Sequence, residues 1–106
     1  MLKNDKKLNY EIVMKIDKVI AALDSNLRRE ILKIIAENPM TVMEVLEKLK
    51  EKGINIKYRE TVYRALEKLL DAELVEKYYV KERGLCYKLS TMILIIDLAK
   101  GIITTR

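Results

Sequence analysis

Apolar residues in the first third of the chain recur every three or four positions, which is the spacing of one face of an α-helix. This pattern predicts a helix over residues 8–23, with an apolar stripe that is wide for so short a helix. A second helix is predicted over residues 26–37, because Asp24 and Ser25 are good N-cap residues and Pro39 disfavours helical backbone in the residue before it. The chain therefore opens with two amphipathic helices.

The middle of the chain predicts two further helices joined by a short link. Thr41 and Glu44 have the spacing of a capping box ahead of an apolar stripe, and they start a third helix that ends near Gly53. A fourth helix is predicted over residues 58–71, with apolar side chains on one face and Arg, Lys, Tyr and Glu side chains on the other. Such a pair of helices is typical of a helix-turn-helix.

Two β-prone segments follow, residues 74–80 and 85–89, and the short turn between them contains Gly84. They predict a β-hairpin. Ser90 can then cap a last helix over residues 91–100, which is apolar nearly all round. Because a bilayer requires about 20 apolar residues, we expect this shorter segment to pack against protein. The order of elements predicts a mostly α winged helix-turn-helix with a small hairpin and an extra helix at each end.

The composition excludes several classes of function. The 106 residues, half of them hydrophobic, fit one domain over residues 1–106. The chain has no His, the side chain most used for proton transfer and metal binding near neutral pH. Its one cysteine, Cys86, cannot form an internal disulfide or complete a thiolate metal site. We therefore expect a protein that is not an enzyme and that has no metal site and no cofactor.

Charge permits an anionic partner without requiring one. The chain has 21 Lys and Arg against 16 Asp and Glu, and these residues are interleaved, so a nucleic-acid site must come from the way folding arranges them. The first ten residues lack the apolar segment of a signal peptide, and we expect a cytoplasmic location. Frequent Lys, Glu and Ile without any Gln favour a thermophilic source, although an AT-rich genome would also raise Lys and Ile.

Two segments resemble known winged-helix families. Residues 22–32 resemble the segment that opens the core of ArsR-type repressors, with Arg28 at the family's arginine, and residues 61–75 are similar to the recognition helix and following turn of ArsR, PadR and Fur-type DNA-binding domains. Asn26 replaces a Pro that is common after the first helix, and Glu73 stands where Gly is usual. Since a non-Gly residue at positive φ is uncommon, the turn at Glu73 is expected to be strained or to take another shape.

The resemblance implies a regulator of transcription, expected to be a repressor, whose recognition helix enters the major groove of double-stranded DNA. The predicted hairpin over residues 74–89 corresponds to the wing of these domains. The candidate DNA-binding residues lie on the recognition helix, just before it, or at the tip of the wing: Lys57, Tyr58, Arg59, Thr61, Tyr63, Arg64, Lys68, Lys81 and Arg83. The alternative for the helix is a solvated polar face with no binding role, on which Arg64 pairs with Glu60 or Glu67. For the wing it is an ordinary polar turn.

ArsR-like proteins dimerise through their terminal helices, and the resemblance implies a homodimer that binds an inverted-repeat operator. The predicted helices at residues 8–23 and 91–103 have more apolar side chains than we expect one small monomer to bury. The candidate dimerisation residues are Ile12, Ile16, Val19, Ile93, Ile96 and Ile103. The alternative is that these helices fold back over their own core.

Two other functions fit the sequence less well than DNA binding. Metal sensing is widespread among ArsR-type repressors, but their sites use cysteine clusters or His with carboxylates, which this chain does not offer. The main alternative is a winged helix that binds protein within a transcription or replication assembly, because Glu60, Glu67 and Glu73 on or near the recognition helix repel phosphate.

Overall fold

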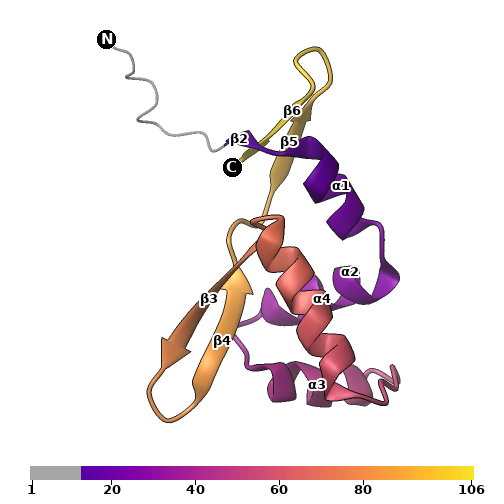
Figure 1. Cartoon of the computed structure of the whole chain (residues 1–106), viewed down its shortest axis with the longest axis vertical. Helices are drawn as coiled ribbons and strands as arrows, with labels where there is room; N and C mark the ends of the chain where they lie inside the picture. Colours follow the sequence, from indigo (N-terminus) through magenta and orange to yellow (C-terminus); the bar gives the residue numbers. More distant parts are fainter. Residues whose placement is uncertain (1–12) are drawn as a thin grey trace.

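The computed structural model describes residues 13–106, which form four helices and two antiparallel sheets (Figure 1). The elements in chain order are β2 (Val13–Met14), α1 (Ile16–Leu23), α2 (Asn26–Ile35), α3 (Val42–Glu51), α4 (Arg59–Asp71), β3 (Val75–Val80), β4 (Gly84–Leu89), β5 (Leu94–Asp97) and β6 (Ile102–Thr105). Helices α2 to α4 and the hairpin β3–β4 agree with the predicted winged helix. The two ends of the described range differ from the prediction.

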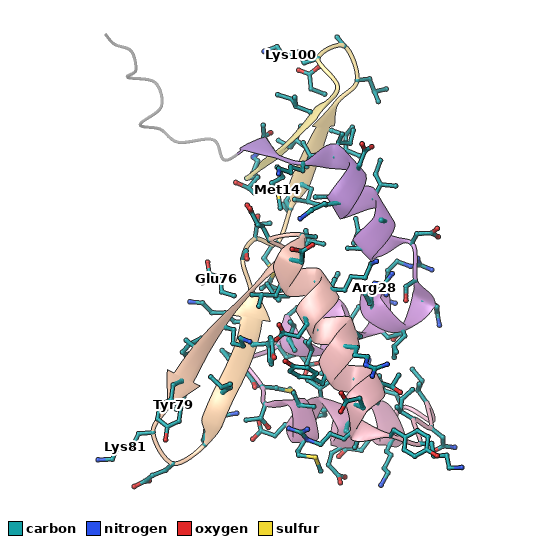
Figure 2. All side chains as sticks on the ribbon, in the orientation of Figure 1. Met14, Arg28, Glu76, Tyr79, Lys81 and Lys100 are labelled. Atoms are coloured by element: carbon teal, nitrogen blue, oxygen red, sulfur yellow. The ribbon has the colours of Figure 1, made fainter. Side chains whose placement is uncertain are left out.

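The first helix is shorter than predicted, because α1 begins at Ile16, after the short strand β2. The rest of its predicted range, including the candidate dimerisation residue Ile12, lies outside the described residues. Arg28 of α2 donates hydrogen bonds to two carbonyl groups in the last turn of α1, Ala22 at 2.7 Å and Ala21 at 3.1 Å. The arginine that the resemblance singled out therefore joins α1 to α2 (Figure 2).

Both predicted helix starts that depend on capping are confirmed. Ser25 Oγ accepts a hydrogen bond of 3.2 Å from the backbone N–H of Arg28, at the start of α2. At the start of α3, Thr41 Oγ1 accepts from the N–H of Glu44 at 3.2 Å, and Glu44 Oε1 accepts from the N–H of Thr41 at 3.0 Å. This reciprocal pair is a capping box, and it satisfies backbone donors that the helix leaves unpaired.

The predicted hairpin is confirmed as β3–β4, with Val75 opposite Leu89 at its base and Val80 opposite Gly84 near its tip. Tyr87 of β4 also pairs with Met40, because each donates its backbone N–H to the carbonyl of the other, at 2.8 and 3.0 Å. The hairpin is thereby attached to the segment that leads into α3.

The predicted C-terminal helix is wrong: residues 91–100 contain strand β5, which pairs with β6 in a second hairpin. Its turn contains Gly101 at φ 69°, and β6 also pairs with β2, giving the strand order β2-β6-β5. The isoleucines that suggested a helix apolar on all sides are β-branched and suit a strand. The supposed dimerisation helix at 91–103 is therefore a hairpin. No helix in the described part of the chain is long and apolar enough to span a membrane.

Helix α4 lies at the centre of the domain and contacts α1, α2, α3 and β3 (Figure 1). Its side chains Val62, Leu66 and Leu69 are fully buried. Two of the candidate dimerisation residues, Val19 and Ile103, are also in the core, at 0% and 1% exposed. They therefore offer no surface to a second copy, because the N-terminal helix and the C-terminal sheet cover part of their own chain.

The turn after α4 was expected either to be strained at Glu73 or to take another shape, and the structure has the strained turn. Glu73 has φ 65°. Its N–H donates to the carbonyl of Leu70 at 2.9 Å, and the N–H of Leu74 donates to that of Leu69 at 3.0 Å. These two bonds define a Schellman motif with Glu73 at the left-handed position that usually holds glycine.

Candidate nucleic-acid interface

Helix α4 has a polar face opposite the face that it buries. The candidate residues on the helix are all exposed, and these are Arg59, Thr61, Tyr63, Arg64 and Lys68. Lys57 and Tyr58, just before the helix, are exposed as well, and Lys57 Nζ lies 5.3 Å from the centre of the Tyr58 ring. Val62 and Leu66 face the core, so the helical period directs the polar side chains outward.

The start of α4, helix α3 and the tip of the wing lie toward the same end of the molecule, opposite the β5–β6 hairpin (Figure 1). A recognition helix and wing that share one end can approach a DNA duplex together. The long axis of the domain, 50 Å, separates this end from the C-terminal sheet.

Of the two ion pairs that the alternative gave to Arg64, the structure contains the one with Glu60. Arg64 Nε lies 3.8 Å from Glu60 Oε2, and the two side chains are 78% and 59% exposed. An exposed pair of this kind stabilises little, so Arg64 remains available to an anionic partner.

Glu67 contacts the wing instead of Arg64. Its Oε2 accepts hydrogen bonds from Lys77 Nζ at 2.8 Å and from Tyr87 Oη at 2.7 Å. The bond from Lys77, followed by that from Tyr87, holds the pKa of Glu67 below its usual value, and burial raises the pKa of Tyr87. This network joins both strands of the wing to the middle of α4. The sequence did not identify it, because no local spacing links these three residues.

The two candidate residues of the wing have different surroundings. Lys81 lies in the turn at the outer end of the wing, close to Tyr79 (Figure 2). Arg83 instead reaches α3, where its Nη2 donates to the carboxylate of Glu44 and to the carbonyl of Pro39 at 3.3 Å. The pKa of Glu44 is lowered chiefly by the hydrogen bond from the Thr41 N–H, with a further contribution from Arg83.

A cleft of about 380 Å³ lies where α3, α4 and the wing meet. Its lining combines basic, hydroxyl and apolar side chains: Thr41, Val42, Met43, Arg59, Tyr63, Arg83, Leu85 and Tyr87. Two guanidinium groups and a phenol hydroxyl suit a phosphate oxygen. Sequence reasoning identified Arg59, Tyr63 and Arg83 but missed Thr41. The capping box indicated only that Thr41 starts α3, where its N–H and Oγ1 are paired with Glu44.

The donor set for a metal is poor in the part of the chain that the structure describes. Residues 13–106 contain no group of three or more His, Cys, Asp or Glu side chains that could hold a metal ion. Cys86 is buried in β4 at 0% exposed.

The model of the ferric uptake regulator family matches residues 24–95 of this chain. The matched range begins just before α2, includes α3, α4 and the wing, and ends within β5. No curated protein and no solved structure matches the chain.

Proposed function

This chain belongs to the ferric uptake regulator family of DNA-binding transcriptional regulators, and we propose that it acts as a homodimeric repressor that recognises a specific double-stranded sequence. The observation that carries the proposal is the exposed basic and hydroxyl face of α4 beside the wing. The major groove admits one helix, and Arg59, Thr61 and Arg64 lie in the half of α4 that would reach base edges and phosphates. Repression would follow from occupation of a promoter.

The family's name refers to ferric iron, but the residues of this chain do not fit a transition-metal site. The chain has no His, and its single Cys is buried away from any group of possible ligands in the described residues. The proposed DNA binding therefore requires no metal.

The C-terminal hairpin supports the proposal of a homodimer, although it is not the helix that we expected. Large hydrophobic side chains are exposed on and beside it: Met92, Ile93, Ile95, Ile96 and Leu98. Ile95 and Ile96 are consecutive in β5 and lie on opposite faces of the hairpin, so contact with a second copy would cover the exposed apolar side chains of one face. A twofold dimer would place two α4 helices on half-sites of an inverted repeat, about one helical turn apart.

Selection of bound sequences from random duplex DNA tests the proposed function. We expect enrichment of an inverted repeat, and we expect affinity to fall steeply with salt, with a slope of about 0.9 in log K per phosphate contacted. Recovery of no preferred sequence, together with no binding to any duplex, would instead favour a winged helix that binds protein.

The role of α4 is tested by Arg59→Ala combined with Arg64→Ala. This variant should lose specific binding while keeping the fold. A matched control, Lys18→Ala with Lys33→Ala, removes the same charge from α1 and α2 and should retain the preferred sequence. Equal affinity of the two variants for the selected site would reject α4 as the recognition helix.

The dimer is tested by the molar mass in solution, measured by light scattering. We expect the mass of two chains for the wild type and of one chain for Ile96→Lys. Tyr79→Lys, at an exposed side chain of the wing, is the control and should leave the dimer intact. A monomeric wild type would exclude the homodimer.

A further inference from the structure

Arg83 is held by the start of α3, which lies 39 residues earlier in the chain. Its Nη2 donates both to Glu44 Oε1 and to the carbonyl oxygen of Pro39. The same Glu44 oxygen accepts the backbone N–H of Thr41, so one carboxylate caps the helix and also binds the wing arginine. The contact therefore connects the wing to the first helix of the helix-turn-helix.

The arginine of this ion pair lines the cleft between α3, α4 and the wing, whereas Glu44 does not. Arg83 lines the cleft together with Arg59 and Tyr63, both of which belong to the polar face of α4. Two positively charged side chains thus come from different elements to one space of about 380 Å³. Within residues 13–106, Arg83 is paired with an acidic side chain whereas Arg59 has no such pair.

We propose that the Glu44 carboxylate competes with a backbone phosphate of duplex DNA for the Arg83 guanidinium, which a phosphate would reach from this cleft. The proposal rests on the proposed DNA-binding function and adds a residue that limits its affinity. In the free protein Glu44 neutralises Arg83. On the duplex, a phosphate takes the guanidinium, and Glu44 keeps its hydrogen bond to the Thr41 N–H.

The exposure of the pair allows this exchange. The side chains of Arg83 and Glu44 are 41% and 46% exposed, so water and a phosphate can reach both. Ion pairs in such surroundings stabilise weakly, whereas a phosphate contact also releases a counterion from DNA. The carboxylate is an anion next to the site of another anion, and it opposes binding for as long as it stays ionised.

Glu44→Gln tests the competition with little change in shape. Glutamine at this position can still accept the Thr41 N–H in a capping box, so the start of α3 is preserved. We expect affinity for the selected duplex to rise about two- to fivefold, the range that corresponds to an exposed ion pair. The salt slope should change little, because Arg83 contacts the phosphate in the wild-type complex as well.

Two further variants separate the pair from a general effect of charge. Glu47→Gln makes the same change of charge on an exposed side chain of α3, and it should raise affinity less than Glu44→Gln. In an Arg83→Gln background, Glu44→Gln should have no more effect than Glu47→Gln, because the arginine for which the two anions compete is gone. Thermal unfolding of each variant confirms that the fold is retained.

The outcomes distinguish the two proposals. If the wild type binds duplex DNA, two results would overturn the competition alone. One is an equal effect of Glu44→Gln and Glu47→Gln on affinity, and the other is a full effect of Glu44→Gln in the absence of Arg83. A loss of affinity in Glu44→Gln with the fold intact would also overturn it, because Glu44 would then assist Arg83. If neither the wild type nor any variant binds duplex DNA, the proposed function and the competition both fail.

Discussion

Replacing Glu73 with glycine is expected to raise the free energy of unfolding by about 0.5–1 kcal/mol. Glu73 ends α4 in the left-handed conformation, at φ 65°, which costs a residue with a Cβ roughly 1–2 kcal/mol. Glycine removes that cost but loses about 0.5–1 kcal/mol more conformational entropy on folding. The side chain of Glu73 is exposed and forms no ion pair with a described residue, so the backbone decides the sign.

Helix α3 ends in the same motif and provides a matched comparison. Gly53 has φ 83°, its N–H donates to the carbonyl of Lys50 at 2.9 Å, and the N–H of Ile54 donates to that of Leu49 at 2.9 Å. A Cβ added at Gly53 would meet no heavy atom within 4 Å. Gly53→Ala therefore changes the backbone preference without a steric clash, and it should lower the free energy of unfolding by about 1 kcal/mol.

Urea unfolding followed by circular dichroism, at one fixed protein concentration, measures both changes. The midpoint of thermal unfolding should rise by about 2–8 °C in Glu73→Gly, because 1 kcal/mol corresponds to about 4–8 °C for a domain of this size. A Glu73→Gly variant that is less stable than the wild type would refute the assignment of strain to this turn. So would a Gly53→Ala variant that is as stable as the wild type.

The contact between the wing and α4 gives two further predictions. Tyr87→Phe should lower the free energy of unfolding by about 1.5–3 kcal/mol, the range for a hydrogen bond to a charged group, whereas Tyr79→Phe at an exposed side chain should change it little; equal effects in urea unfolding would contradict this role of the hydroxyl. Because the folded-state pKa of Glu67 is lowered from 4.5, its contribution to stability is complete above that pH and is lost as pH falls through the folded-state value. Glu67→Gln should therefore lose less stability than the wild type as pH falls below 4.5, which thermal unfolding at a series of pH values measures. If the variant and the wild type lose the same stability, the lowered pKa of Glu67 is contradicted.

Much of the winged helix could be predicted because its signals are local. Ser25 and Thr41 mark helix starts by hydrogen bonds to backbone only three residues ahead. The apolar period of α4 predicts which face is buried, and Arg59 and Arg64 are therefore exposed as that period requires. The resemblance also drew attention to Glu73, where Gly is usual, but it left open a strained turn or another shape, and the φ of 65° decided between them. The role of Arg59 and Arg64 in DNA binding stays a prediction that the experiments above address.

The sequence by itself thus determined three of the helices, the wing and the exposed side of the recognition helix, because each depends on residues a few positions apart. Only the tertiary structure decided the two ends of the described range and the surroundings of the wing arginine. Strand β6 pairs with β2 from the other end of the chain, and this pairing turns an apolar segment that favoured a helix into a sheet. Likewise, Arg83 meets Glu44 only after the wing packs against α3. Such contacts depend on which distant segments folding brings together, and a local period does not contain that information.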